Sequence, residues 1–260
     1  MAFGSYEVGA IQRNPLPELS DSDTDHLADL ASAAWILKRK LDFDSEVSHA
    51  YIMPAVFIEK LLKESKEAIG EELVNIRSDI DAVVARLYGM KAPDGIGVIS
   101  SAVGGFDDEA ESEVKRSDHD LLSWCIGVVF GRLDCQLAIG EREVPSVPEP
   151  FSALPAKSLG MLPDGVEPFH ICEGILVDDP GHSHDLSQLI ESVLKRVDLP
   201  APDEMRSWLR KDFFKEHLKQ YSKSRRKAPI YWPLATATGS YTLWVYYPDL
   251  DDQTLYTAIN

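Results

Sequence analysis

The chain has 260 residues and is acidic, with 43 aspartates and glutamates against 26 lysines and arginines and a formal net charge of −17. Its 44% hydrophobic content suffices for a folded core, while three cysteines are too few and too scattered for a disulfide framework. The nearly apolar run 121–131 is far shorter than the roughly 20 residues of a membrane-spanning helix. With no signal peptide at its start, we expect a cytoplasmic protein without a membrane segment.

The N-terminal region predicts a strand followed by an amphipathic helix. Residues 6–11 alternate as a strand does, and the chain leaves this strand through Pro15 and Pro17. Ser20 or Asp21 is a suitable N-cap for the helix that follows. The apolar residues of this helix recur at helical spacing: Leu27, Leu30, Ala34, Leu37 and Leu41.

Two more helices are expected before residue 90, at 48–66 with Pro54 near its start and at 71–88 closed by Gly89. The acidic, glycine-containing stretch that follows predicts an exposed loop at 107–113. Asp118 is then expected to cap a buried helix that ends at Leu133.

Six of the sixteen prolines lie between Pro145 and Pro168, which predicts an extended connector without a helix or central strand. Beyond it we expect a short strand near Ile175 and a helix at 183–197. A basic helix follows, and then a hairpin of two aromatic strands around the turn 238–240.

These elements predict an α+β fold, predominantly helical, with a small antiparallel sheet that includes the C-terminal aromatic hairpin. We divide the chain into four regions on this basis. They are a strand plus helical region at 1–90, an acidic loop and buried helix at 91–144, the proline-rich connector at 145–168, and the basic helix with its hairpin at 169–260.

The segment 206–227 is the strongly cationic part of the chain. It holds five lysines and four arginines against Asp212 and Glu216, a net charge of +7, so the other residues sum to −24. Such a basic strip on an acidic protein indicates a polyanionic partner, most often nucleic acid. The structural alternative is a solvated helix face whose apolar residues pack inward. Those apolar residues are Trp208, Leu209, Phe213, Leu218 and Tyr221.

The sequence RRKAPIYWPLATATGSYTLWVYYPDLDDQTLYTAIN, at 225–260, resembles the C-terminal region of PglX-type adenine-specific DNA methyltransferases of BREX phage-defence and related restriction-modification systems. In that family a basic helix leads into an R/K-x-P-I-Y-W strand, an aromatic return strand, and a D-x-x-T-L helix start. Here these parts correspond to 211–227, 229–232, 241–247 and 251–255.

Other stretches resemble the same family in the same order: YEVGAIQRNPLPELS at 6–20, RSDIDAVVARLYGM at 77–90, DHDLLSWCIGVVFGRLD at 118–134, and LPDGVEPFHICEGILVDDPGHSHDLSQLIESVL at 162–194. The catalytic Asn/Asp-Pro-Pro-aromatic loop of adenine methyltransferases, which holds the extruded base, is absent from the chain. Asn14-Pro15-Leu16-Pro17 lacks both the second proline and the aromatic residue, and no strand with a glycine-rich turn for an adenosine cofactor occurs.

The resemblance therefore implies the noncatalytic, specificity-side portion of a site-specific adenine methyltransferase, inactive by itself. It implies no catalytic residue and no cofactor in this chain, with S-adenosylmethionine bound by a catalytic partner. The implied partners are double-stranded DNA and the catalytic portion or other defence-system subunits. The implied backbone-phosphate contacts are Lys211, Lys215, Lys219, Arg225, Arg226 and Lys227. Tyr231 and Trp232 are further DNA-binding candidates, with a place in the core as their alternative.

Three alternatives stay open at this point. The net charge of −17 also fits an acidic interaction module or DNA mimic in a defence complex. The chain also begins and ends in the middle of family elements, which fits a remnant of a larger gene. Finally, one group of side chains offers zinc-ligand chemistry at unfavourable spacing: His170, Cys172, His182 and His184.

Overall fold

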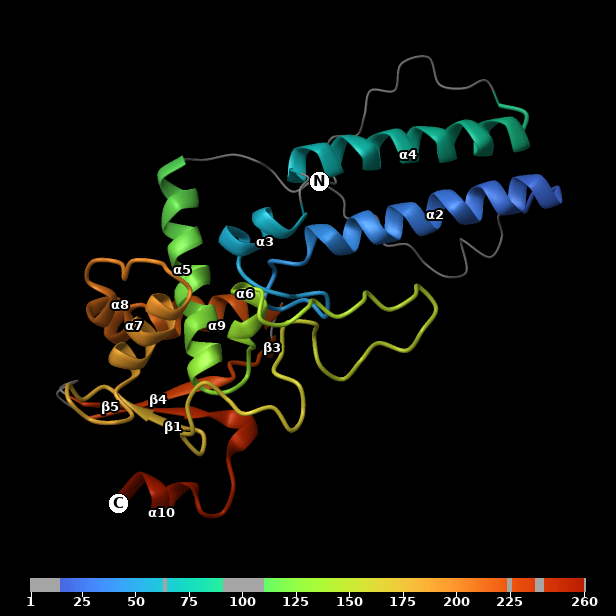
Figure 1. Cartoon of the computed structure of the whole chain (residues 1–260). Helices are drawn as coiled ribbons and strands as arrows, with labels where there is room; N and C mark the ends of the chain where they lie inside the picture. The colour runs from blue at the N-terminus through green and yellow to red at the C-terminus, as the bar shows by residue number, and fades with distance from the viewer. Residues whose placement is uncertain (1–14, 63–64, 91–109, 224–225, 237–240, 260) are drawn as a thin grey trace. The chain divides into compact units, whose positions relative to one another are not determined.

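The computed structural model describes residues 15–62, 65–90, 110–223, 226–236 and 241–259 (Figure 1). They form an α+β protein, predominantly helical with a small antiparallel sheet, which confirms the predicted fold class. The chain divides into two compact units, one built from 1–39 and 65–106 and the other from 40–64 and 107–260. The strand predicted at 6–11 and the hairpin turn at 238–240 lie outside the described residues.

The first unit contains two long helices, α2 (Asp21–Leu41) and α4 (Lys66–Leu87), which run in opposite directions (Figure 1). Only the last two residues of α2 belong to the second unit. Each helix begins at a serine whose hydroxyl accepts a backbone hydrogen bond: Ser20 from the Asp23 N–H and Ser65 from the Ala68 N–H. The two helices are joined by the Arg86–Asp23 ion pair of 2.5 Å.

The helix predicted at 48–66 is much shorter, because α3 (Ala55–Leu62) begins only after Pro54. Proline is compatible with the first turn of a helix, and the residues before it form hydrogen-bonded turns instead. The helix predicted at 71–88 begins earlier, at Lys66, because Ser65 caps it. It ends as predicted, before Gly89 with its positive φ of 62°.

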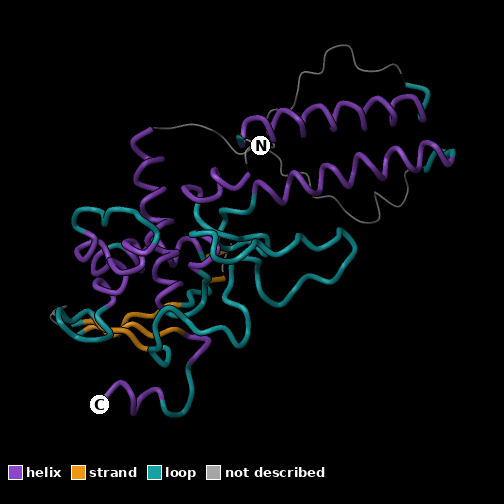
Figure 2. Tube along the Cα trace, in the orientation of Figure 1, coloured by secondary structure: helices purple, strands orange, loops and turns teal. Residues whose placement is uncertain are grey.

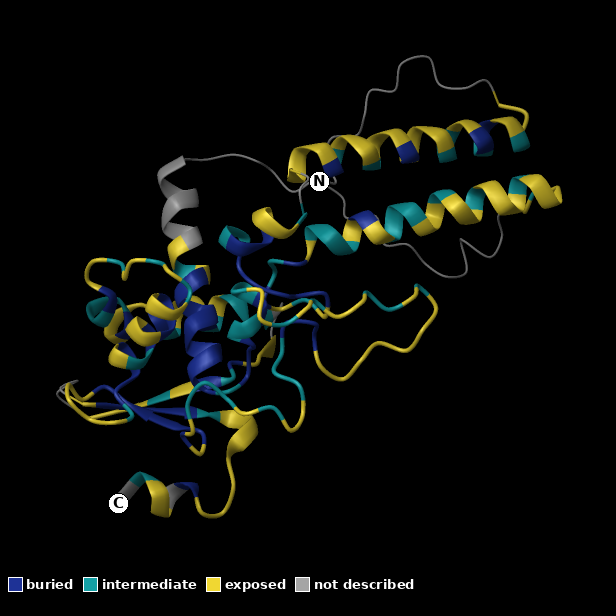
Figure 3. Ribbon diagram, in the orientation of Figure 1, coloured by how far each residue is buried: buried dark blue, intermediate teal, exposed yellow. Residues whose placement is uncertain are grey.

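The second unit is built around α5 (Ala110–Val129), which begins before Asp118. The prediction that Asp118 caps this helix is therefore wrong, and so is the part of the predicted loop that overlaps its first turn. Glutamate is a good helix former and is favoured near a helix N-terminus, so the acidic stretch extends the helix. Residues 121–130 are buried without interruption and form the centre of the core (Figure 3).

Helices α7 (Leu186–Arg196) and α9 (Phe213–Gln220) pack against α5, and α8 (Met205–Lys211) lies against both α7 and α9. The short α6 (Cys135–Ala138) follows the end of α5. The proline-rich stretch 145–168 contains no helix or strand, which confirms the predicted connector. No helix among the described residues is long and apolar enough to cross a membrane.

The sheet has three antiparallel strands in the order β1-β5-β4, as the orange tubes in Figure 2 show. They are β1 (Ile175–Val177), β5 (Thr242–Tyr246) and β4 (Tyr231–Ala235). One face contributes Leu176, Tyr231 and Trp244 to the main core. The opposite face forms a smaller cluster of Ile175, Leu243 and Val245, against which Ala258 of α10 (Thr254–Ile259) packs.

A separate two-stranded ribbon, β2 (Ser222–Lys223) and β3 (Arg226–Lys227), lies between α9 and β4 in the chain. The Ala228 N–H donates to the Tyr221 carbonyl at 3.0 Å, so the base of this ribbon is attached to the end of α9. After β5 the chain continues through the 3-10 helix η1 (Tyr247–Asp249) to α10.

Candidate nucleic-acid interface

The basic segment forms two helices, because α8 ends and α9 begins around Asp212. Its apolar residues face inward as the sequence predicts. Leu209 and Phe213 are buried, and Trp208, Leu218 and Tyr221 are half-buried. The inward packing leaves the charged side chains on the opposite side of these helices.

Two arginines of this segment are paired with buried acids of the same unit. Arg206 forms ion pairs with Asp178 and Asp185, at 2.5 Å to each carboxylate, and Arg210 binds the second oxygen of Asp178. Asp178 and Asp185 are buried at the end of β1 and at the N-cap of α7. These two cations therefore attach α8 to the sheet and to α7, and they contribute little charge to the surface.

Five other cations of the basic segment are described and exposed, and all five were predicted to contact phosphates. The exposed set comprises Lys211, Lys215, Lys219, Arg226 and Lys227. Lys215 forms a surface ion pair with Asp212 at 3.2 Å. Arg225, the sixth predicted phosphate contact, lies outside the described residues, and the side chain of Lys223 is likewise not described.

The outward face of α9 is electrically balanced. Its exposed residues follow helical spacing, and the two lysines alternate with two acids: Asp212, Lys215, Glu216 and Lys219. Strand β3, by contrast, carries two exposed cations, Arg226 and Lys227, on consecutive positions, one toward each face of the ribbon. Within the described part of the basic segment, the ribbon next to the end of α9 therefore carries positive charge that no acid of the segment alternates with.

Tyr231 and Trp232 point to opposite sides of β4. Tyr231 has no exposed surface and stacks on Phe130 at a ring distance of 5.1 Å, so it belongs to the core and is not available to a partner. Trp232 is 44% exposed. Its indole N–H donates to the Pro229 carbonyl at 3.2 Å, and its ring lies 5.7 Å from that of Phe214 on α9.

A buried histidine joins α9 to the start of β4. The Nε2 atom of His217 accepts hydrogen bonds from the Ile230 N–H at 2.9 Å and the Tyr231 N–H at 3.3 Å. Both bonds require an unprotonated Nε2, and burial lowers the pKa of His217 from 6.5 to about 4. The neutral ring therefore holds the strand that presents Trp232 against the helix that carries Lys215 and Lys219.

A buried carboxylate fixes the end of α9. Glu46 accepts hydrogen bonds from the Ser123 hydroxyl at 2.7 Å and the Tyr221 hydroxyl at 2.9 Å, and it forms an ion pair with Arg132. Burial raises the pKa of Glu46, but the Arg132 charge and these hydrogen bonds outweigh it, so the pKa lies below its ordinary value. Sequence analysis missed Glu46, Arg132 and His217, because nothing in the local sequence indicates partners so far apart along the chain.

The four candidate zinc ligands do not form one group. His170 Nε2 and His184 Nδ1 are 2.8 Å apart, while His182 is exposed and its Nδ1 accepts from the His184 N–H. The Cys172 thiol is buried and directed at the Val129 carbonyl at 3.9 Å. Within the described ranges, no three His, Cys, Asp or Glu side chains come together as a metal site.

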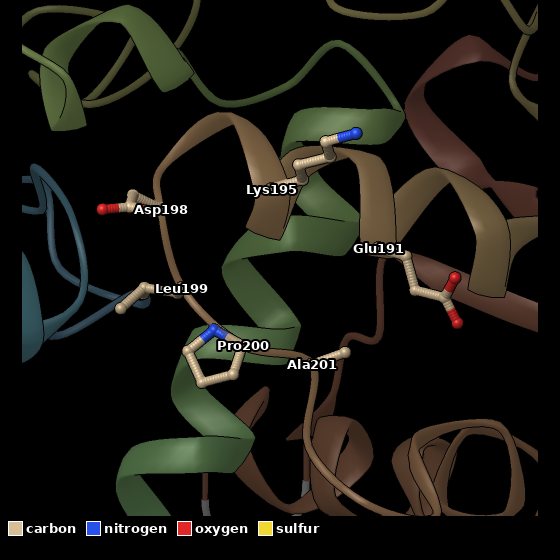
Figure 4. A pocket seen from close by; sticks show the side chains of 6 residues that line it. All are labelled: Glu191, Lys195, Asp198, Leu199, Pro200 and Ala201. Atoms are coloured by element: carbon tan, nitrogen blue, oxygen red, sulfur yellow. The ribbon is translucent and has the colours of Figure 1, made fainter.

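A pocket of about 450 Å³ lies at the end of α7 (Figure 4). Its charged residues are Glu191, Lys195 and Asp198, and their side chains point in three different directions. Leu199, Pro200 and Ala201 complete the lining. Because the charged groups do not converge, the pocket does not have the arrangement that acid–base or nucleophilic catalysis needs.

Comparison with known proteins assigns no class to this surface. The sequence matches no model of a known protein family, and it matches no curated protein. What defines the candidate interface is therefore its geometry: exposed cations on α9 and the ribbon, and an exposed indole on the adjoining strand.

Proposed function

We propose that this chain is the DNA-recognition and scaffold portion of an adenine-specific DNA methyltransferase and acts together with a catalytic portion that this sequence does not contain. The observation that carries the proposal is the separation of cations in the basic segment. Arg206 and Arg210 are neutralised by the buried Asp178 and Asp185, whereas Arg226 and Lys227 are exposed on a ribbon attached to α9. Exposed paired cations on a fixed element are suited to backbone phosphates.

In this proposal the protein positions the duplex and performs no chemistry. Lys219, Arg226 and Lys227 bind consecutive phosphates, and Lys215 joins them once DNA competes with Asp212 for its ammonium group. Glu46 and His217 hold the end of α9 and the start of β4, so the cations are presented without an ordering cost at binding.

The methyltransferase class rests on the resemblance of residues 225–260 and of the four further stretches to the PglX-type enzymes. The catalytic partner would bind S-adenosylmethionine, extrude the adenine and transfer the methyl group. Such a division of labour agrees with the absence of an Asn-Pro-Pro-Tyr loop from this sequence.

Fluorescence anisotropy with a labelled duplex, measured from 50 to 200 mM salt, tests the proposal. Arg226→Ala/Lys227→Ala is expected to weaken binding and to reduce the slope of log K against log salt by about 1.8, since each phosphate contact contributes about 0.9. Lys60→Ala/Lys195→Ala removes two exposed cations elsewhere in the same unit and should leave the slope unchanged. Equal slopes for the wild type and the ribbon variant would overturn the assignment of these residues.

A second candidate function is an acidic protein-interaction module. It is favoured by the balanced charges on the exposed face of α9, which leave the net charge of −17 dominant over most of the chain. In this case the protein does not bind the duplex even at 50 mM salt. It instead displaces DNA from a cationic DNA-binding protein, which the same anisotropy assay measures in competition mode.

A further inference from the structure

The exposed side of β4 is unusual in presenting an aromatic residue to solvent. Trp35 and Trp208 are half-buried, Trp124 and Trp244 are fully buried, and Trp232 is the one tryptophan of five that is exposed. On the same side of β4, Leu234 is 57% exposed. Trp232 and Leu234 are neighbours on one side of the strand, so this side presents adjacent apolar side chains to solvent, as surfaces that bind partners do.

The Trp232 ring is held in place before any partner binds. Its N–H is hydrogen-bonded to the Pro229 carbonyl at 3.2 Å, and one side packs on Phe214 with the two ring planes inclined by 48°. The backbone of Trp232 is paired with Val245 in the sheet. A fixed ring loses little conformational freedom on binding, which favours it as an anchor.

Exposed cations lie near this ring along the chain. Phe214, which packs on the ring, is followed on α9 by Lys215, and Pro229, which accepts its N–H bond, lies two residues after Lys227 of the ribbon. A fixed aromatic platform next to exposed cations is how proteins bind unpaired nucleotides, since the ring stacks on the base and the cations follow the backbone. Bases inside a duplex are already stacked on their neighbours and offer no free face.

We infer that Trp232 stacks on an unpaired base, so that the site takes single-stranded or locally opened DNA in addition to duplex phosphates. The inference rests on the proposed function, because it uses the same cations. Stacking on one base contributes about 1–3 kcal/mol in other proteins. Loss of the ring should therefore weaken single-strand binding by about 5-fold to 150-fold.

The test compares a labelled 12-nucleotide single strand with the duplex of the same sequence at one salt concentration. Trp232→Ala should weaken single-strand binding at least about five-fold while leaving its salt slope and the duplex affinity unchanged. Trp232→Phe retains a stacking ring and should recover most of the affinity. Tyr256→Ala, which removes an exposed aromatic ring on α10, is the matched control and should change neither affinity.

The outcomes separate this inference from the function on which it rests. If wild type binds DNA but Trp232→Ala binds the single strand as tightly as wild type, the stacking role is overturned and the duplex function stands. An equal loss for single strand and duplex would also overturn it, because the ring would then only support the fold. If neither DNA form binds to wild type, both proposals fail. Thermal unfolding of each variant shows whether Trp232→Phe and Trp232→Ala remain folded.

Discussion

The hydroxyl of Tyr221, at the end of α9, donates a hydrogen bond of 2.9 Å to the carboxylate of Glu46, 175 residues earlier in the chain. The same carboxylate binds Ser123 of α5 and Arg132 beyond its end. Three segments are thus joined at one buried charge. Because Tyr221 directly precedes the ribbon of Arg226 and Lys227, the placement of the candidate interface depends on this interaction.

Replacing Glu46 with alanine should strongly destabilise the second unit. Glu46 and Arg132 are 7% and 8% exposed, so the variant leaves a buried guanidinium without its anion. Breaking a buried pair from one side typically costs about 3–5 kcal/mol. Urea unfolding followed by tryptophan fluorescence measures the change in the free energy of unfolding.

The matched control for Glu46→Ala is Asp81→Ala, which breaks an exposed ion pair with Arg77 on α4. Such surface pairs contribute roughly 0–1 kcal/mol. If the two variants lose the same stability, the Glu46 network is not the anchor that its geometry indicates.

Stability should fall as the pH is lowered from about 6.5 toward about 4, because of His217. The folded pKa of this ring, about 4, lies below the ordinary value of 6.5, so the unfolded chain binds the proton first. The neutral His217 ring contributes fully to the free energy of unfolding above pH 6.5. This contribution is lost as the pH falls, at up to about 1.4 kcal/mol per pH unit. Urea unfolding midpoints measured between pH 6.5 and pH 4 give the slope of stability against pH.

His217→Gln should flatten that dependence, since a glutamine carbonyl can still accept a backbone hydrogen bond but does not titrate in this range. Burial also lowers the pKa of His170, so His170→Ala is the comparison variant and should keep the His217 part of the slope. An unchanged slope in His217→Gln would exclude His217 as its origin.

Gly160→Ala should disrupt the packing of the proline-rich connector. A Cβ at this position would lie 1.9 Å from the Ile52 carbonyl oxygen, a backbone atom that is itself part of the core. The Gly160 N–H also donates to the Tyr51 carbonyl at 2.9 Å, so the two segments cannot separate without losing this bond. We expect a loss of several kcal/mol, measured as a lower midpoint of thermal unfolding.

The comparison for Gly160→Ala is Gly70→Ala in α4, where an added Cβ meets no atom within 4 Å. Alanine is favoured over glycine inside a helix by about 1 kcal/mol, so this variant should be slightly stabilised. A similar response at both positions would contradict the close approach at Gly160.

Arg206→Ala should reduce stability without affecting DNA binding. Its guanidinium is the counter-ion of the buried Asp185 and, with Arg210, of Asp178. We expect a loss of about 2–5 kcal/mol in the free energy of unfolding, because a buried carboxylate is left without its partner. The duplex affinity of the folded variant should equal that of wild type. A weaker affinity with normal stability would instead place Arg206 in the interface.

Several elements of this fold follow from short stretches of sequence. The serine cap of α2, the stop at Gly89 and the proline-rich stretch without helix or strand are local effects, and each lies where the sequence predicts it. The cap of α4 at Ser65 was not predicted. The start of α5 was missed because helix propensity extended the helix beyond the apolar stretch. The helix predicted at 48–66 was too long, because the buried apolar residues 50–53 reach the core from turns that precede α3.

The local conformations, the α+β class and the inward stripe of the basic segment could be predicted without the structure, because they depend on residues close together in the chain. Which cations are neutralised depends on long-range packing. Arg206 and Arg226 are alike in sequence, but Arg206 lies against two buried aspartates and Arg226 does not. Alternation along β4 separates Tyr231 from Trp232, yet it is the packing of α5 and α9 on one face that buries the tyrosine and leaves the indole in solvent.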